Sequence, residues 1–337
     1  LQHQIAKNAI ILAEAIAQRG IRIAYGGTNT HMLLIDCKGI RGDDGAYLSG
    51  DIAARLLDLC GIVANRNTIP GDRSAFSASG VRLGTTWITQ RGFFEEHCRE
   101  LGNIIADVFY ACTPYYLREE SAKELRAKVD FDTLQQARNR VRDLVARIGI
   151  DTDVRADGYP HFFYMEQEQA DGTWSTLEIA GKHAEDFLDV VLSGRVLGIG
   201  ENTLEPSYIL EPDGQVMSRV LLQREGNRYQ LHIEQNAQRV TAWLRSLSDG
   251  FVRFDADLLA KVPGAVDVSR VEGGFDGNTS DWTAESGYTN KPYFIGCKGA
   301  YCQAPKTPAL PVFEWAIPAE TTTLLTTPIH ALHQSMG

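Results

Sequence analysis

The sequence lacks any long hydrophobic run. No stretch of its 337 residues approaches the ~18 consecutive apolar residues that indicate a membrane-spanning helix, so we expect no membrane protein. Basic residues are also in the minority, 33 against 43 acidic residues, which leaves a formal net charge of -10. This balance, mixed along the chain, argues against nonspecific binding of nucleic acid through a basic face and is typical of a charged, soluble surface.

Cysteine is sparse and widely spaced. The six cysteines are Cys37, Cys60, Cys98, Cys112, Cys297 and Cys302. Their density is far below that of a disulfide-stapled domain. The closest pair, at 297 and 302, has no second pair beside it to complete a tetrahedral metal site. We therefore expect free thiols, a cytoplasmic location and no metal.

The first 150 residues predict helices packed on a small sheet. Helices are expected over residues 1–19, 49–61, 93–111 and 121–148, the last in one or two pieces, and strands over 21–25 and 32–36. Gly20 is the expected end of the first helix, and Ser49 and Asp51 are expected to cap the second. These elements predict an α+β unit.

Residues 62–86, IVANRNTIPGDRSAFSASGVRLGTT, carry the most evident chemistry. A strand is expected to start at residues 62–63, followed by a polar loop in which Phe76 is expected to be buried. In the strand after this loop, alternate side chains share a face, so Arg82 points away from its two apolar neighbours. A guanidinium in that position needs an anionic partner, either in an internal ion pair or in a bound ligand.

Helical periodicity stops near residues 150–160, where we place a domain boundary. Beyond it, strands are expected at 161–166, 174–179 and 229–234, helices at 181–194 and 236–247, and turns at 171–172 and 212–214. Strands and helices that alternate around an internal hairpin predict a ferredoxin-like α+β layer. The predicted domains are therefore residues 1–150, 151–272 and 273–337, the last beginning with a Gly- and Ser-rich linker.

Four sequence phrases occur in a distinctive order. They are GGTNTH at 26–31, GIVANRNTIP at 61–70, SGVRLGTT at 79–86 and TQRGF at 89–93. Together they resemble the C-terminal part of serine hydroxymethyltransferase, a pyridoxal-phosphate enzyme that moves a one-carbon unit between serine and tetrahydrofolate. The resemblance covers residues 1 to about 148. It implies the small C-terminal domain of a fold-type I pyridoxal-phosphate enzyme, acting as a homodimer on serine or glycine with tetrahydrofolate as co-substrate.

The resemblance implies roles for five residues. Arg82 matches the arginine that binds the substrate's carboxylate, and Asn67 matches the asparagine that hydrogen-bonds the pteridine ring. Phe76 and Ser79 lie on the segment that shapes the folate pocket, and His31 keeps the histidine of the GGT loop. Taken alone, Asn67 is typical of a turn and His31 of a structural hydrogen bond.

The family's cofactor lysine follows a threonine-rich stretch that ends in His-Lys. No lysine of this chain has that neighbourhood. We therefore expect most of the pyridoxal-phosphate site upstream of Leu1, in an interior piece of a longer polypeptide. Alone, the chain supplies about half a site and is expected to be inactive.

The second part more faintly resembles aminomethyltransferase, the tetrahydrofolate-dependent T-protein of glycine cleavage. The phrases LEIAGKHAEDFLDVVLSGRV at 177–196 and KPYFIG at 291–296 carry this resemblance. Where that family has an aspartate pair that positions folate, this chain has QVMSR at 215–219, which contains no carboxylate. The resemblance implies a degenerate domain within a fused one-carbon polypeptide, a T-protein remnant after residue 273 and a further T-protein beyond the end.

These resemblances predict a glycine hydroxymethyltransferase in the full-length protein. Two alternatives stay open. One is a noncatalytic folate-binding or scaffolding protein that has inherited both shapes. The other is a pyridoxal-phosphate aldolase that acts on other β-hydroxy amino acids.

Overall fold

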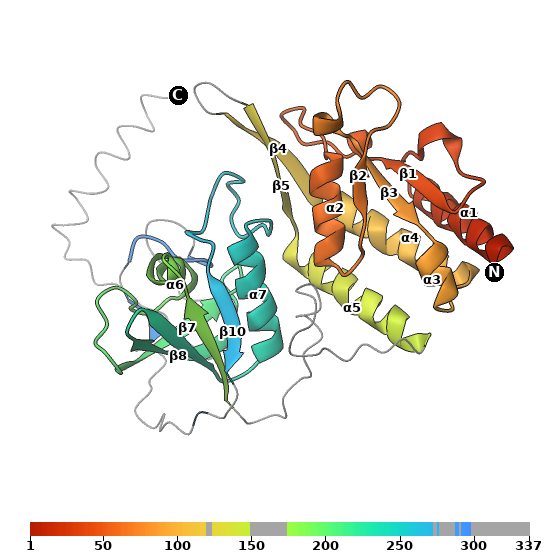
Figure 1. Cartoon of the computed structure of the whole chain (residues 1–337). Helices are drawn as coiled ribbons and strands as arrows, with labels where there is room; N and C mark the ends of the chain where they lie inside the picture. Colours follow the sequence, from red (N-terminus) through yellow and green to blue (C-terminus); the bar gives the residue numbers. More distant parts are fainter. Residues whose placement is uncertain (119–122, 149–173, 272–274, 276–286, 290, 298–337) are drawn as a thin grey trace.

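The computed structural model describes residues 1–118, 123–148, 174–271, 275, 287–289 and 291–297. They form two units, each around its own hydrophobic core, with helices α5 and α7 between them (Figure 1). No helix in the described ranges is long and apolar enough to cross a membrane. The expected strand at 161–166, the turn at 171–172 and the boundary at 150–160 lie outside the described residues.

The first unit is a three-stranded antiparallel sheet covered on one face by helices. Its elements are α1 (Gln2–Gln18), η1 (Ala24–Gly26), β1 (Met32–Asp36), η2 (Cys37–Gly39), α2 (Gly50–Leu59), β2 (Asn65–Asn67), η3 (Ala75–Ser77), β3 (Gly80–Gly84), α3 (Thr86–Gln90), α4 (Glu95–Tyr110), β4 (Cys112–Arg118), β5 (Lys123–Val129) and α5 (Phe131–Arg147). The sheet order is β1-β3-β2, and β4 and β5 form a separate hairpin. The predicted helices α1, α2 and α4 are confirmed, as is strand β1.

Helix α2 is fixed against the sheet at its N-terminus. Ser49 caps it, with its Oγ accepting a hydrogen bond of 3.3 Å from the backbone N–H of Ile52. A Cβ on Gly50 would lie 2.2 Å from the carbonyl oxygen of Gly80 on β3, so only glycine allows this close approach. The start of α2 therefore packs directly on the central strand.

The strand predicted at residues 21–25 is wrong. Ile23 makes a single bridge to Ile35, and the chain then turns through η1. Tyr25 has a φ of 61°, and Gly26 and Gly27 also have positive φ, which no strand accommodates. The strand expected to start at 62–63 instead starts at Asn65.

The helix predicted from residue 121 is also wrong in its first half. Residues 123–129 form β5, and the helix starts only at Phe131. The sequence KELRAKV is rich in helix formers, but its apolar residues alternate in the strand period. Leu125, Ala127 and Val129 pair with successive alternate residues of β4, which the sequence alone did not predict.

The second unit is a five-stranded antiparallel sheet with two helices. Its elements are β6 (Ser175–Ala180), α6 (Ala184–Val191), β7 (Leu204–Leu210), β8 (Val216–Glu225), β9 (Arg228–Ile233), α7 (Ala237–Asp249) and β10 (Asp267–Val271). The strand order is β10-β6-β9-β8-β7. Apolar residues of α6 and α7 pack with those of the inner strands in one core. The predicted strands at 174–179 and 229–234, both helices and the hairpin through 212–214 are confirmed, whereas β10 was not predicted.

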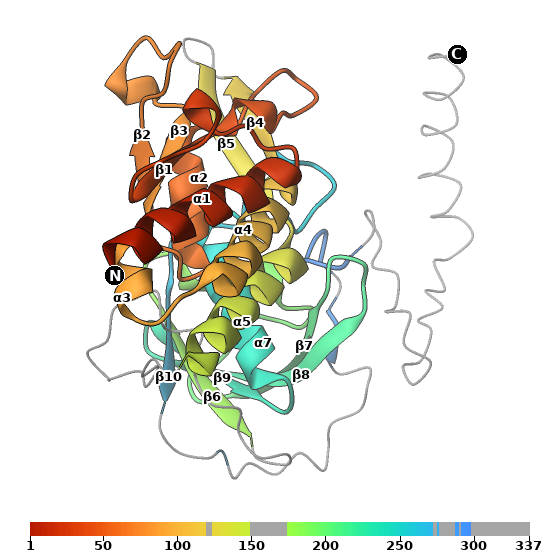
Figure 2. The same cartoon turned by 90° about the vertical axis from the view of Figure 1, so that its right-hand side faces the viewer.

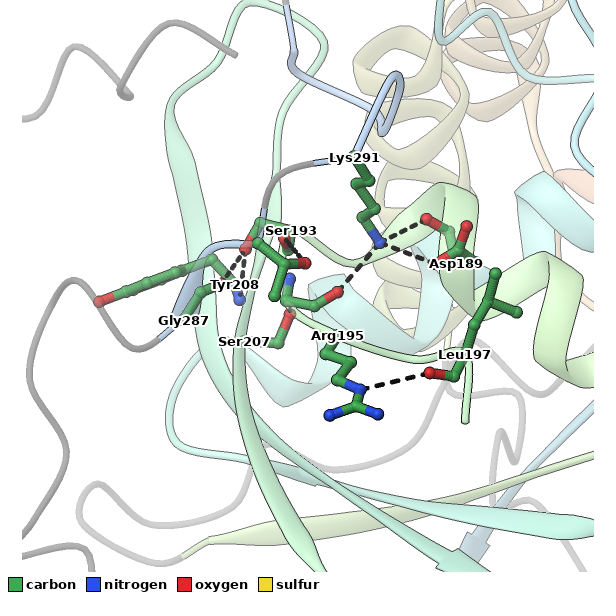
Figure 3. A network of polar contacts seen from close by, with 10 residues as sticks. Asp189, Ser193, Arg195, Leu197, Ser207, Tyr208, Gly287 and Lys291 are labelled. Atoms are coloured by element: carbon green, nitrogen blue, oxygen red, sulfur yellow. Dashed lines mark hydrogen bonds and ion pairs between the residues drawn. The ribbon is translucent and has the colours of Figure 1, made fainter. Parts of the chain in front are cut away.

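Residues 287–289 and 291–297 pack across the end of α6. The side chain of Lys291 is 10% exposed, and its Nζ donates to the carbonyl oxygens of Asp189 at 2.6 Å and Gly194 at 3.0 Å. Figure 3 shows this contact and the neighbouring one, in which Ser193 Oγ donates to the carbonyl oxygen of Gly287 at 2.6 Å. These buried polar contacts attach the segment to the second unit.

The two units meet along α5 and α7 (Figure 2). The ring of Phe131 packs edge-on against that of Trp243, with centroids 4.7 Å apart. The backbone of Val129 accepts a hydrogen bond from Arg253 and donates one to Phe251, each of 2.8 Å. The end of β5 in the first unit is therefore hydrogen-bonded to the backbone of the second unit, and the two units pack against each other directly.

The prediction of free thiols is confirmed for the five cysteines that the structure describes, which are all buried. Burial raises the pKa of Cys60, Cys98 and Cys112 to about 12. These thiols are therefore protonated and unreactive. Cys302 lies outside the described residues.

Candidate functional site

Arg82 lies on the central strand of the small sheet. It is directly opposite Leu34 on β1 and Asn65 on β2. Residues directly opposite each other in an antiparallel sheet project from the same face. Leu34, Arg82 and Asn65 therefore form a row across all three strands.

The two faces of this sheet differ in exposure. The face beneath α1, α2 and α4 is apolar and at most 6% exposed, and its strand residues are Leu33, Ile35, Val81 and Leu83. The opposite face has exposed or half-buried side chains at Met32, Leu34, Asn65, Asn67 and Arg82, and we call these five residues the open face. Asp36, which shares this face at the end of β1, is 4% exposed and pairs with Arg22 at 2.8 Å. The predicted alternation around Arg82 is confirmed.

Arg82 is exposed, and among the described residues its guanidinium makes no ion pair or hydrogen bond. The described part of the chain therefore does not provide the internal ion pair that the sequence left open. Its neighbour on the adjacent strand, Arg66, behaves differently: it points to the helix-covered side and pairs with Asp51 of α2 at 3.0 Å. Arg82 is thus left available to an anion from outside this sheet.

Asn67 lies at the edge of the open face, opposite Gly80. Its Nδ2 donates a 2.7 Å hydrogen bond to the carbonyl oxygen of Thr68. A Cβ on Gly80 would lie 2.4 Å from Cγ2 of Ile69 and 2.9 Å from the carbonyl oxygen of Asn67. The absence of a side chain at Gly80 therefore allows the loop after Asn67 to pack closely on β3.

The loop between β2 and β3 is closed by Asp72, whose side chain is 4% exposed. Its Oδ2 accepts hydrogen bonds from the backbone N–H groups of Ile69 at 3.0 Å and Ser79 at 2.9 Å. The hydroxyl of Ser79, which is fully buried, donates to Oδ1. Burial alone would raise the pKa of Asp72, but these hydrogen bonds and the nearby charge of Lys38 outweigh it and lower the pKa.

Phe76 is not buried as expected. It lies in η3 at the tip of this loop and is 92% exposed. Its backbone N–H donates to Ser74 Oγ at 3.1 Å in a local turn that holds the ring away from the core. A role for Phe76 in lining a ligand pocket stays a prediction.

His31 lies at the end of the open face where β1 begins. Its side chain is exposed, and its carbonyl oxygen accepts hydrogen bonds from the backbone N–H and the Oγ1 of Thr85, at 2.9 and 3.2 Å. Its backbone thereby joins the start of β1 to the end of β3. Of the five predicted site residues, the sheet register places Arg82 and Asn67 on one face.

Sequence reasoning missed two residues of this region. Asn65 shares the open face with Arg82, and the alternation in Asn-Arg-Asn is the signal that could have revealed it. Asp72, in the Pro-Gly-Asp turn, was not assigned a role. The strand positions of the open face contain no lysine, and no group of residues suited to a metal ion occurs in the part of the chain that the structure describes.

Comparison with known proteins supports the resemblance in the first unit. Residues 1–105 match the family model described as serine hydroxymethyltransferase. A protein of Schizosaccharomyces pombe named "Probable serine hydroxymethyltransferase, cytosolic" is 34% identical over 170 residues, which are 50% of this chain and 31% of that protein. Serine hydroxymethyltransferases of Chlamydia caviae and Chlamydia muridarum are 37% and 38% identical over 146 residues, 43% of this chain and 28% of each relative.

The chain thus spans about a third of the length of the curated relatives it matches, with shares of 28% to 31%. The family model ends at residue 105, before the second unit begins. Residues 1–105 of this chain are similar to a part of serine hydroxymethyltransferase.

Proposed function

We propose that the protein is a glycine hydroxymethyltransferase, which transfers a one-carbon unit between serine and tetrahydrofolate. The observation that carries this proposal is the exposed guanidinium of Arg82, which has no acidic partner among the described residues. A planar guanidinium binds a carboxylate through two parallel hydrogen bonds. In this role Arg82 holds the carboxylate of serine or glycine, and Asn67 holds the pteridine ring of tetrahydrofolate.

Pyridoxal phosphate is the cofactor that this proposal requires, and it supplies an electron sink at the reacting carbon. The open face fits the carboxylate of an amino acid but has no lysine to attach the cofactor. We place that lysine in the portion of the relatives that this chain does not span. The homodimer and the cytoplasmic location belong to the same proposal, the latter supported by a relative whose name includes "cytosolic".

We further propose that the second unit is a degenerate aminomethyltransferase-like domain. Strands β10, β6, β9 and β8 are neighbours in the order expected of a ferredoxin-like layer, with β7 added at the edge. In the stretch 215–219, which corresponds to the aspartate-bearing strand of that family, Ser218 is buried and donates to the carbonyl oxygen of Gln235 at 2.7 Å. Arg219 pairs with Glu234 at 3.3 Å. Because residues 215–219 include no carboxylic acid, we infer that this unit is not an active transferase.

Substitution of Arg82 in the intact protein tests the main proposal. Arg82→Ala should raise the KM for serine and lower kcat/KM by about two to four orders of magnitude, because truncating one partner of a hydrogen-bonded charge pair costs roughly 2–5 kcal/mol. Arg66→Ala is the matched control, since Arg66 projects from the opposite face. Near-normal serine kinetics in Arg82→Ala would reject the assignment.

Assays of serine and threonine turnover by the wild-type protein distinguish the hydroxymethyltransferase from the two alternative functions. Turnover of serine that depends on tetrahydrofolate supports the hydroxymethyltransferase. Cleavage of threonine with weak binding of tetrahydrofolate would favour the aldolase instead. A folate-binding or scaffolding protein would turn over neither amino acid.

A further inference from the structure

We propose that Asn65 is a second carboxylate-binding residue, which acts beside Arg82 and helps to select amino acids as ligands of the open face. This inference rests on the proposed function, in which Arg82 binds the carboxylate of serine or glycine. It adds a residue for which neither the sequence motifs nor the named relatives provided a role. The register of β2 against β3 carries it.

Asn65 and Arg82 are direct cross-strand partners. Directly opposite residues have Cβ atoms roughly 4.5–5.5 Å apart and project from the same face. Both residues are exposed, so each side chain is free to reach over the sheet. The carboxamide of Asn65 therefore lies within reach of any anion that the Arg82 guanidinium holds.

Asn65 differs from the next two residues of β2, because their side chains already have partners. Arg66 is engaged with Asp51 at 3.0 Å, and the Nδ2 of Asn67 is engaged with Thr68 at 2.7 Å. The side chain of Asn65 makes no hydrogen bond within the described ranges. The Nδ2 and Oδ1 atoms of its side chain therefore make no hydrogen bond to the described residues.

In the row formed by Leu34, Arg82 and Asn65, the two neighbours of Arg82 differ in polarity. On the β1 side the guanidinium has an aliphatic neighbour, and on the β2 side a carboxamide. A carboxylate that receives two N–H groups from arginine still has free lone pairs, and the Nδ2 of Asn65 is positioned to donate to one of them. The neutral amide also leaves the charge of Arg82 intact, whereas an acid at position 65 would form an ion pair with it.

The experiment measures glycine binding by calorimetry and serine kinetics in the intact protein. Asn65→Ala should weaken glycine binding by about tenfold or more, the size of a lost hydrogen bond to a charged group. The KM for serine should rise more than kcat falls, because the contact is made equally in the ground state and the transition state. Asn65→Asp should weaken glycine binding further, since its carboxylate would compete for Arg82.

Arg66→Ala serves as the control on the same strand, and it should leave glycine binding unchanged. If Arg82→Ala abolishes glycine binding while Asn65→Ala binds glycine as tightly as wild type, this inference is overturned and the proposed function stands. If Arg82→Ala also binds glycine normally, the proposed function itself fails. Thermal unfolding of each variant shows whether it is folded. If Asn65→Ala does not fold, Asn65→Asp provides the second test.

Discussion

The carboxylate of Asp72 accepts hydrogen bonds from both the backbone N–H and the hydroxyl of Ser79, seven residues further along the chain. The same carboxylate accepts the backbone N–H of Ile69 at 3.0 Å. One side chain thus joins the two ends of the loop between β2 and β3. Because Asn67 precedes this loop and Arg82 follows it, Asp72 holds together the two strands that carry the proposed ligand-binding residues.

Replacing Asp72 with asparagine should destabilise the fold. The amide keeps one acceptor oxygen but loses the charge, so at least one backbone donor is left without its charged partner. We expect the free energy of unfolding to fall by about 1.5–3 kcal/mol, the range for hydrogen bonds to charged groups. Urea denaturation measures it, with Asp43→Asn as the control because Asp43 is exposed and its side chain makes no hydrogen bond or ion pair among the described residues. Equal stability of the two variants would contradict this account of the loop.

The contribution of Asp72 should also depend on pH. Its folded-state pKa is lowered below the ordinary value, so the folded state binds the proton less readily than the unfolded state does. The stabilisation is therefore present above the unfolded pKa of about 4 and is lost as the pH falls through the folded pKa. The difference in unfolding free energy between wild type and Asp72→Asn should shrink between pH 6 and pH 3. A difference that stays constant over that range would show that the carboxylate charge is not involved.

Elements with local signals were predicted well from the sequence. Ser49 caps α2 as expected, and the Pro-Asp-Gly turn at 212–214 joins β7 to β8. The hairpin of β4 and β5 was missed because its composition favours helix and its stability comes from distant partners. Val129 shows this directly: it pairs with Cys112 and also with the backbone of Phe251, more than a hundred residues away in the second unit.

The candidate site was predictable only in part for a similar reason. The two-residue period of a strand was sufficient to orient Arg82 away from Val81 and Leu83. The period alone does not reveal which strand lies alongside or in which register, so Asn65 could not be paired with Arg82 in advance. Phe76 was expected to be buried, but the loop that carries it is held together by polar contacts and leaves the ring exposed.

The two units should lose stability together when Arg239 is changed. This arginine of α7 donates to Asp132 at 2.7 Å and to Gln135 at 3.0 Å on α5, and to Glu211 of its own unit at 2.9 Å. Lysine keeps the charge but not the fork of donors, so Arg239→Lys should lower the free energy of unfolding by about 1–2 kcal/mol, a value reduced by partial exposure. Thermal unfolding measures it.

Arg142→Lys on the surface of α5 is the control for that measurement, since Arg142 pairs with the adjacent Asp143. The loss in Arg239→Lys should be smaller in high salt, because salt screens partly exposed ion pairs. A wild-type melting temperature for Arg239→Lys would show that the packing of Phe131 on Trp243 holds the units together without the ion pairs.

Strand β3 begins at Gly80 and ends at Gly84, and substitution of these two glycines by alanine should affect stability differently. A Cβ at Gly80 would lie 2.4 Å from Cγ2 of Ile69, whereas at Gly84 the nearest heavy atom, the carbonyl oxygen of His31, is 3.8 Å away. Gly80→Ala must therefore displace the loop after β2 and should destabilise the fold by about 1–3 kcal/mol, as overpacking of a close contact does. Gly84→Ala should be within about 0.5 kcal/mol of wild type, as expected for a surface substitution. Urea denaturation of the two variants compares them on the same strand. Because the displaced loop follows Asn67 directly, the proposed function predicts that Gly80→Ala also weakens tetrahydrofolate binding. Normal stability of this variant would contradict the close approach of the loop to β3.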